Sequence, residues 1–216
     1  MNGDLIKIGG ISLIALLVGL LGGYMIRGKG TADTAMNKHM SAAATEATQK
    51  EETAPVDHAS AEWKIQNAMS AAPENVSAQA TVIDWPLKEG EDFSSLKKGT
   101  NEWTCLPDDP GTPGNDPVCV DAMAMQWFGA YMSKKTPKVA QAGLAYMLQG
   151  GSDASNVDPY AKTPKEGEAW MDAPPHLMVF PTTPPDPKVY GTDMHSGGPW
   201  VMWANTPYAH LMIPVE

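Results

Sequence analysis

The chain repeats one short pattern near its C-terminus, first as Pro175-His176-Leu177-Met178-Val179-Phe180 and again as Ala209-His210-Leu211-Met212-Ile213-Pro214. Successive side chains of a strand alternate between its two faces. The pattern therefore predicts two strands that each have branched aliphatic residues on one face. The other face of each strand carries a histidine followed by a methionine.

Apolar runs and turn signals place further elements around these strands. Ser60 and Asp121 each precede a segment with helical spacing and are suitable N-caps. We expect a compact α+β domain at 59–216 with a small antiparallel or mixed sheet. The strands are expected near 80–85, 102–106, 140–148, 176–181, 200–204 and 208–213, and two helices, near 60–72 and 121–133, are expected to cover one face.

The only two cysteines, Cys105 and Cys119, flank a segment made almost entirely of turn-forming residues. In an oxidising compartment this arrangement predicts a disulfide that closes the segment into a loop. Closing a loop of about fifteen residues removes on the order of 3 kcal/mol of entropy from the unfolded state. The acidic residues of this loop lack the spacing of an EF-hand, so we interpret it as a solvated acidic loop.

The N-terminal segment 1–29 is predicted to be a transmembrane anchor. Residues 5–26 are almost entirely apolar, and as a helix they would span about 33 Å, close to the thickness of a bilayer core. A cleaved signal peptide is the alternative, but it would need a small-residue cleavage site, and no good site follows Ile26. The sequence therefore favours an uncleaved single span.

Residues 30–58 lack apolar periodicity and are rich in Ala, Thr, Lys and Glu, which is typical of a flexible linker. Arg27 and Lys29 would favour a cytoplasmic C-terminal side, whereas the cysteine pair favours an oxidising compartment. We expect a single-pass protein of the inner membrane with residues 59–216 in the periplasm.

Charge excludes one class of partner. The formal charge is −10, from 25 acidic against 15 basic residues. Nucleic-acid surfaces need clustered Lys and Arg to neutralise phosphates, so we expect no nucleic acid as a partner. The expected partners are the membrane, through residues 5–26, and other membrane-protein subunits.

The first candidate ligand site follows the predicted strand at 140–148. Ser152, Asp153, Asn156 and Asp158 lie on a Gly-rich loop, where side chains are well placed to meet a ligand. The loop has neither a phosphate-loop pattern nor a nucleophile-elbow pattern. A tight loop whose polar side chains bond their own backbone is the competing interpretation.

The second candidate site is a copper centre in the C-terminal segment. Thioether sulfur suits Cu(I), and imidazole suits copper in general. The candidate ligands are His176, Met178, Met194, His195, His210 and Met212. These residues can converge only if the two His-Leu-Met strands are neighbours. The competing interpretation is core packing, with methionine as a gap-filler and each imidazole hydrogen-bonded.

From Trp63 onward the chain resembles an uncharacterised family of bacterial exported (periplasmic) proteins. The resemblance rests on Trp103-Thr-Cys-Leu-Pro107, Thr112-Pro-Gly-Asn-Asp-Pro117, Tyr146-Met-Leu-Gln-Gly-Gly-Ser-Asp-Ala-Ser-Asn156, Gly197-Gly-Pro-Trp-Val-Met-Trp203 and Thr206-Pro-Tyr-Ala-His-Leu-Met212. It implies export and carries over no activity, substrate or cofactor. The anchor and linker depart from the simple export signal of such proteins.

These observations favour a membrane-anchored, non-enzymatic binding or accessory domain, with a copper-binding module as the alternative. An enzyme ranks last. Asp153, His195 and Ser196 could act as acid, base and nucleophile, but their spacing selects no reaction.

Overall fold

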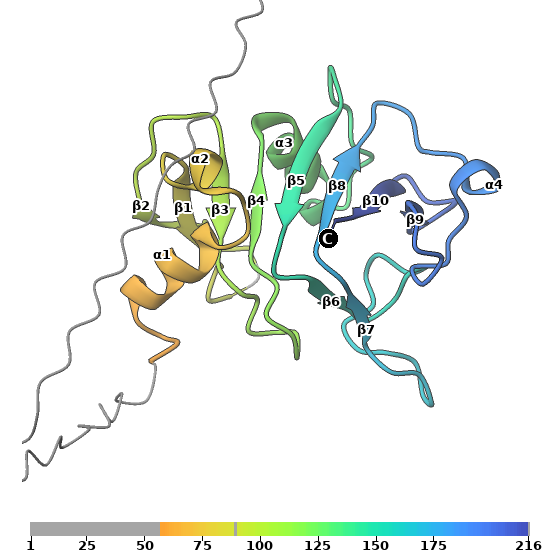
Figure 1. Ribbon diagram of the computed structural model, residues 1–216, viewed down its shortest axis with the longest axis horizontal. Coiled ribbons are helices and arrows are strands. Elements are labelled where there is room, and N and C mark those ends of the chain that lie inside the picture. The colour runs from red at the N-terminus through yellow and green to blue at the C-terminus, as the bar shows by residue number, and fades with distance from the viewer. Residues whose placement is uncertain (1–56, 89, 216) are drawn as a thin grey trace, which may run out of the picture. The chain divides into compact units, whose positions relative to one another are not determined.

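The computed structural model describes residues 57–88 and 90–215 (Figure 1). The predicted anchor and nearly all of the predicted linker lie outside these residues. Within the described ranges, no helix has the length and apolar character needed to cross a bilayer.

An eight-stranded mixed sheet forms the centre of the domain, in the order β2-β1-β3-β4-β5-β8-β10-β9. Its neighbouring strands are antiparallel except β1 and β3, which are parallel. The strands are β1 (Thr81–Asp84), β2 (Ser94–Lys97), β3 (Thr104–Leu106), β4 (Val118–Val120), β5 (Gly143–Met147), β8 (His176–Phe180), β9 (Trp200–Met202) and β10 (His210–Pro214). A separate two-stranded sheet pairs β6 (Gly151–Asp153) with β7 (Met171–Ala173). The predicted α+β class with a mixed sheet is confirmed.

The helices are α1 (Ala61–Met69), α2 (Glu74–Ser77), α3 (Ala122–Met132) and α4 (Pro187–Tyr190). Ser60 caps α1 by accepting a hydrogen bond from Trp63 N, and Asp121 caps α3 by accepting one from Ala124 N. Both predicted N-caps are confirmed. Each cap satisfies a backbone N–H that has no partner within the helix.

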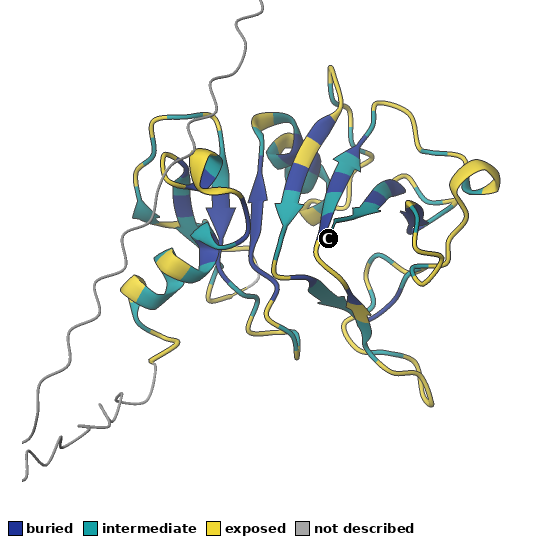
Figure 2. Cartoon of the chain, viewed as in Figure 1, coloured by how far each residue is buried: buried dark blue, intermediate teal, exposed yellow. Residues whose placement is uncertain are grey.

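The expectation that both long helices cover one face of the sheet is wrong. Figure 1 shows α1 in front of β1–β4 and α3 behind β4 and β5. Alternation along β4 explains the difference, because Cys119 faces α1 while Val118 and Val120 face the other side. All three residues of β4 are buried, so each face of this strand needs its own cover (Figure 2).

The two His-Leu-Met strands, β8 and β10, are antiparallel neighbours, with Met178 directly opposite Met212. The burial of β8 alternates as predicted, with His176, Met178 and Phe180 buried and the residues between them half-buried. On β10, His210 and Met212 are buried on the same face. The two predicted strands thus lie side by side in antiparallel orientation, and the faces that carry their His and Met residues form one continuous surface.

The predicted disulfide between Cys105 and Cys119 is present. The two cysteines are directly paired residues of β3 and β4, and both are fully buried beneath α1. The loop that they close does not remain entirely in solvent. Asp116 is buried, which corrects the interpretation of a solvated acidic loop.

Candidate functional site

A cavity of about 210 Å³ lies against the His/Met face of the sheet. Its walls come from the sheet, from α3, from the β6–β7 hairpin and from the disulfide loop. Aromatic and thioether side chains predominate. The lining residues are Trp85, Asp109, Thr112, Asp116, Val118, Trp127, Phe128, Tyr131, Met147, Gly151, Ser152, Asp153, Met171, Ala173, His176, Met178, Phe180, Met202, Trp203, His210 and Met212.

The two histidines in the lining share one arrangement. His176 is 1% exposed and His210 is 2% exposed. Nδ1 of each ring lies within hydrogen-bond distance of the carbonyl two residues earlier, Pro174 O at 2.7 Å and Tyr208 O at 2.9 Å. A carbonyl can only accept, so Nδ1 carries the proton and Nε2 keeps its lone pair.

Burial keeps both imidazoles neutral. It lowers the pKa of His176, and it lowers the pKa of His210 to about 4, against an opposing contribution from the carbonyl bond of each ring. His176 Nε2 is buried without a hydrogen-bond partner. His210 packs among the rings of Trp127, Phe180 and Trp203, at centroid distances of 5.0 to 5.6 Å. The two rings are therefore neutral acceptors within an apolar wall.

The register separates the two histidines. His176 pairs with Pro214, which lies four residues beyond His210 on β10. With a rise of about 3.3 Å per residue, this offset amounts to about 13 Å along the strands. The strands are antiparallel, so the bonds to the preceding carbonyls draw the two rings in opposite directions. Both imidazoles nonetheless line the same cavity, and His176 contributes to the lowered pKa of His210 after burial.

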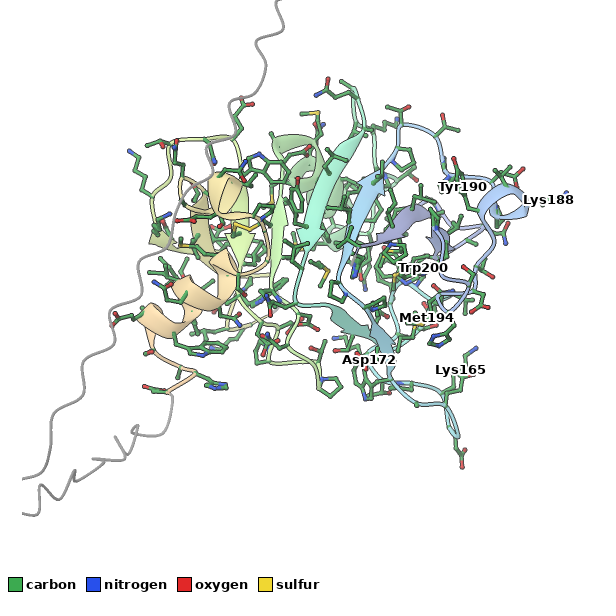
Figure 3. All side chains as sticks on the ribbon, viewed as in Figure 1. Lys165, Asp172, Lys188, Tyr190, Met194 and Trp200 are labelled. Carbon is green, nitrogen blue, oxygen red and sulfur yellow. A yellow bond between two sulfur atoms is a disulfide. The ribbon has the colours of Figure 1, made fainter. Side chains whose placement is uncertain are left out.

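The other predicted copper ligands do not all line this cavity. Met178 and Met212 line the cavity between the two histidines, whereas Met194 and His195 are not among its lining residues. Figure 3 shows Met194 in the loop beyond α4, and His195 is exposed in the same loop. Within 57–88 and 90–215, no group of three or more His, Cys, Asp or Glu side chains is placed to hold a metal ion. Four of the six predicted copper ligands thus line the cavity and two lie outside it, and copper binding stays a prediction.

Asp153 and Ser152, two of the predicted ligand-binding residues, line the cavity from β6. The Asp153 carboxylate accepts a hydrogen bond from Ser155 N at 2.8 Å. Burial raises the pKa of Asp153 to about 6, although the backbone N–H groups of Ser155 and Ala154 act in the opposite direction and Asp116 adds like charge. The structure thus holds an acid in the cavity wall that titrates close to neutral pH.

Ser152 is fixed by the disulfide loop. Its hydroxyl donates to Asp116 Oδ2 at 3.1 Å and accepts from Gly114 N at 3.1 Å. Asp116 also accepts hydrogen bonds from Thr112 Oγ1 at 2.6 Å and from Asp109 N at 3.1 Å. These contacts pin the loop to β6 and explain the burial of Asp116. They also commit the Ser152 hydroxyl to a structural bond.

Asn156 and Asp158, the other two predicted ligand-binding residues, are not among the lining residues. The Asn156 amide donates to Thr192 O at 2.8 Å, and its backbone carbonyl accepts from Trp203 N. Asp158 is exposed and accepts a hydrogen bond from Tyr160 N. Asp158 thus stabilises its own turn, as the competing interpretation of this loop predicted, whereas Asn156 joins the loop to Thr192 and Trp203.

Sequence reasoning missed the aromatic wall and the buried Asp116. Trp127 and Tyr131 fall on the apolar stripe of α3, and such a stripe is ordinarily core. Trp203 follows β9 in a turn, where its indole Nε1 donates to Ser155 O at 2.9 Å. Only the three-dimensional fold shows that the rings of Trp127, Tyr131 and Trp203 face the same cavity as Asp153. No signal for the burial of Asp116 was available, because the three-residue strand β4 that follows Pro117 is too short to be recognised in the sequence.

The arrangement is suited to binding. Both imidazoles bond backbone carbonyls, and Ser152 bonds a carboxylate, so these groups form no nucleophile–base hydrogen bond with one another. Comparisons with known protein families, with curated proteins and with solved structures gave no match. The family resemblance stated above therefore stays a prediction.

Proposed function

We propose that residues 59–216 form a non-enzymatic binding domain whose small-molecule ligand occupies the cavity on the His/Met face. The observation that carries this proposal is the cavity itself, a partly open space of about 210 Å³ lined mainly by aromatic and thioether side chains with a few polar groups. Ligand sites generally combine an apolar lining with a small number of placed polar groups. A dry apolar cavity of about 150 Å³ is large enough to bind benzene. This cavity therefore suits a single-ring ligand with a short polar arm.

Ligand binding can be tested with the full chain purified in a mild detergent and a panel of single-ring compounds. Trp85, Trp127 and Trp203 line the cavity, so their fluorescence reports on its occupancy. We expect at least one compound to bind with one-to-one stoichiometry. Ala173→Phe places a ring in the cavity and should weaken that binding tenfold or more. The matched surface variant, Leu87→Ala, changes a side chain that is 90% exposed and should bind as the wild type does.

A panel in which no compound distinguishes the wild type from Ala173→Phe would count against the proposal. Circular dichroism of both variants must show the wild-type fold, because a collapsed Ala173→Phe variant would lose binding for an unrelated reason. Met178→Phe supplies a second way to reduce the cavity from the sheet side.

The proposal includes attachment to the inner membrane through residues 5–26, with the domain in the periplasm and with other membrane-protein subunits as partners. It is supported by the length of the apolar segment and by the disulfide, which is typical of oxidising compartments. Membrane fractionation of the full chain, followed by protease treatment of spheroplasts, tests it. We expect the domain to sediment with membranes and to be cleaved from outside. Recovery in the soluble fraction would contradict the anchor.

A further inference from the structure

The charged side chains that line the cavity are all acidic. The lining includes three carboxylates, Asp109, Asp116 and Asp153, and no Lys or Arg. The two histidines in the wall are neutral acceptors. Basic residues such as Lys165 and Lys188 are exposed on outer segments of the domain (Figure 3). An anionic ligand would meet only like charge here, because no group in the wall could balance it.

Asp153 is the carboxylate best placed to meet a ligand. Both oxygens of Asp116 already accept hydrogen bonds, and Asp109 Oδ1 accepts from Gly111 N. Asp153 bonds backbone N–H groups of its own turn, and no cationic side chain lines the cavity beside it. Asp153 is half-buried, and a carboxylate withdrawn from water without a counter-charge is costly, so a cation that enters the cavity would offset this cost.

The wall beside Asp153 is aromatic. Tyr131 stacks on Trp203 at 5.2 Å and on Trp127 at 5.9 Å, with interplanar angles of 19° and 20°. Burial raises the pKa of Tyr131, and the Asp153 carboxylate is close enough to add to this effect. The face of an aromatic ring attracts a cation within about 6 Å of its centroid, and more strongly where water is excluded.

We propose that the ligand is a small organic cation, whose ammonium group lies against the Asp153 carboxylate while its apolar body contacts the aromatic and methionine side chains. This inference rests on the function proposed above and names the chemical class of the ligand. The ligand charge supplies the missing counter-ion, and the apolar body replaces water in the remaining volume.

The pH dependence of this binding involves every titratable group that faces Asp153. These groups are Asp116 and Asp109 on the disulfide loop, Tyr131 on α3, His176 on β8 and His210 on β10. Tyr131 is uncharged across the acid range because its pKa is raised to about 12. Protonation of Asp153 removes the counter-charge, so binding of a cation should weaken as the pH falls through about 6.

The test compares two probes of the same size on the full chain, phenethylamine, which is cationic, and 2-phenylethanol, its neutral counterpart. We expect phenethylamine to bind at least tenfold more tightly at pH 7.5, and this preference to be lost at pH 5. Asp153→Asn should remove the preference at pH 7.5. Asp172→Asn is the matched control, because this exposed carboxylate lies on the same hairpin and outside the cavity lining (Figure 3).

The outcomes separate the two proposals. If both probes bind equally and both are displaced by Ala173→Phe, the cavity is a ligand site but the cationic ligand is refuted. If neither probe nor any compound of the panel binds in a cavity-dependent manner, the proposed function itself fails. The pH series on the wild type keeps the inference testable even if Asp153→Asn does not fold.

Discussion

At the level of single residues, burial acts in opposite directions on the titratable groups of the cavity. It disfavours the charged form of every group, so it raises the pKa of a carboxyl and lowers the pKa of an imidazole. Asp153 and His210 illustrate the two cases within one wall. Their contributions to stability therefore change with pH in opposite senses.

Asp153→Asn is expected to stabilise the ligand-free protein at pH 7. The pKa of Asp153 is about 6 in the folded state and near 3.8 when unfolded, so the folded state binds the proton more tightly. The cost of the ionised group is absent below about pH 4 and complete above about pH 6. A shift of about two units corresponds to on the order of 3 kcal/mol as an upper bound. Urea unfolding should show a gain of about 1–3 kcal/mol at pH 7 that closes at pH 4. A gain that is the same at both pH values would contradict the assignment.

His210→Phe is expected to reduce acid sensitivity. The folded pKa of His210 is about 4, below its ordinary value of 6.5, so protonation favours the unfolded chain. Stability from this group is complete above about pH 6.5 and is lost as the pH falls toward 4. Phe fits among the same rings and cannot titrate, although it forfeits the bond to Tyr208 O. The wild type should lose on the order of 2–3 kcal/mol more than the variant between pH 7 and 4.5. Exposed His195→Ala serves as the control, and equal losses in wild type and His210→Phe would refute the prediction.

Alternation predicted which side chains of the twin strands share a face, and the burial of His176, Met178 and Phe180 follows it. Alternation could not give the register between the strands, because register depends on the turns and the partners of each strand. The predicted copper site required the two strands to be neighbours, which they are, but their register offsets His176 from His210 by four residues, about 13 Å along the strands. Ser152 and Asp153 were predicted as ligand residues and do line a cavity, but only the three-dimensional packing shows the aromatic wall that they face.

At the level of elements, the strands within visible apolar runs were predictable, including the three-residue β3 and β9, whereas β4, β6 and β7 were not. The strands near 80–85, 176–181 and 208–213 have enough apolar residues to show a period. β4 has only three residues between Pro117 and Asp121, which is too few for any period to be visible. β6 and β7 have three residues each and show no apolar run, and they are strands because their backbones pair with each other across a long connection. β4 is buried on both faces, so one helix is needed on each side of the sheet. Because β4 was not predicted, both helices were placed on one side, which was wrong.

The contact between α3 and β5 gives a prediction at this scale. A Cβ on Gly143 would overlap the backbone at Ala124, in the first turn of α3. Gly143→Ala should therefore separate helix and strand and lower the free energy of unfolding by about 1–3 kcal/mol. Gly129 lies within α3 with open space around it, so Gly129→Ala should stabilise the helix by about 0.5–1 kcal/mol. The opposite signs can be measured by urea unfolding. A neutral Gly143→Ala would show that the helix does not pack as closely as described.

At the level of the whole molecule, the disulfide and the loop that it closes contribute to both faces of the sheet. Cys105 and Cys119 are buried on the α1 face, while the loop that they close extends to the cavity on the other face. Pro107 and Pro117, at the two ends of this loop, are almost completely buried. Asp116, next to Pro117, joins this end of the loop to Ser152 on β6. One covalent bond therefore supports both the packing of α1 and a wall of the ligand site.

Replacing both cysteines, Cys105→Ala with Cys119→Ala, should lower the free energy of unfolding by about 2–4 kcal/mol. The loop entropy restored to the unfolded chain accounts for on the order of 3 kcal/mol, and the buried sulfur contacts beneath α1 add to it. The loop stays tied to β6 through the bonds of Asp116, so binding of phenethylamine should weaken less than tenfold at temperatures where the variant is folded. Urea unfolding with and without a reducing agent checks the assignment, because reduction should destabilise the wild type and leave the double variant unchanged. If reduction also destabilised the double variant, the reducing agent would be acting elsewhere. If complete reduction left the free energy of unfolding of the wild type unchanged, the noncovalent contacts of the loop would be sufficient to hold it.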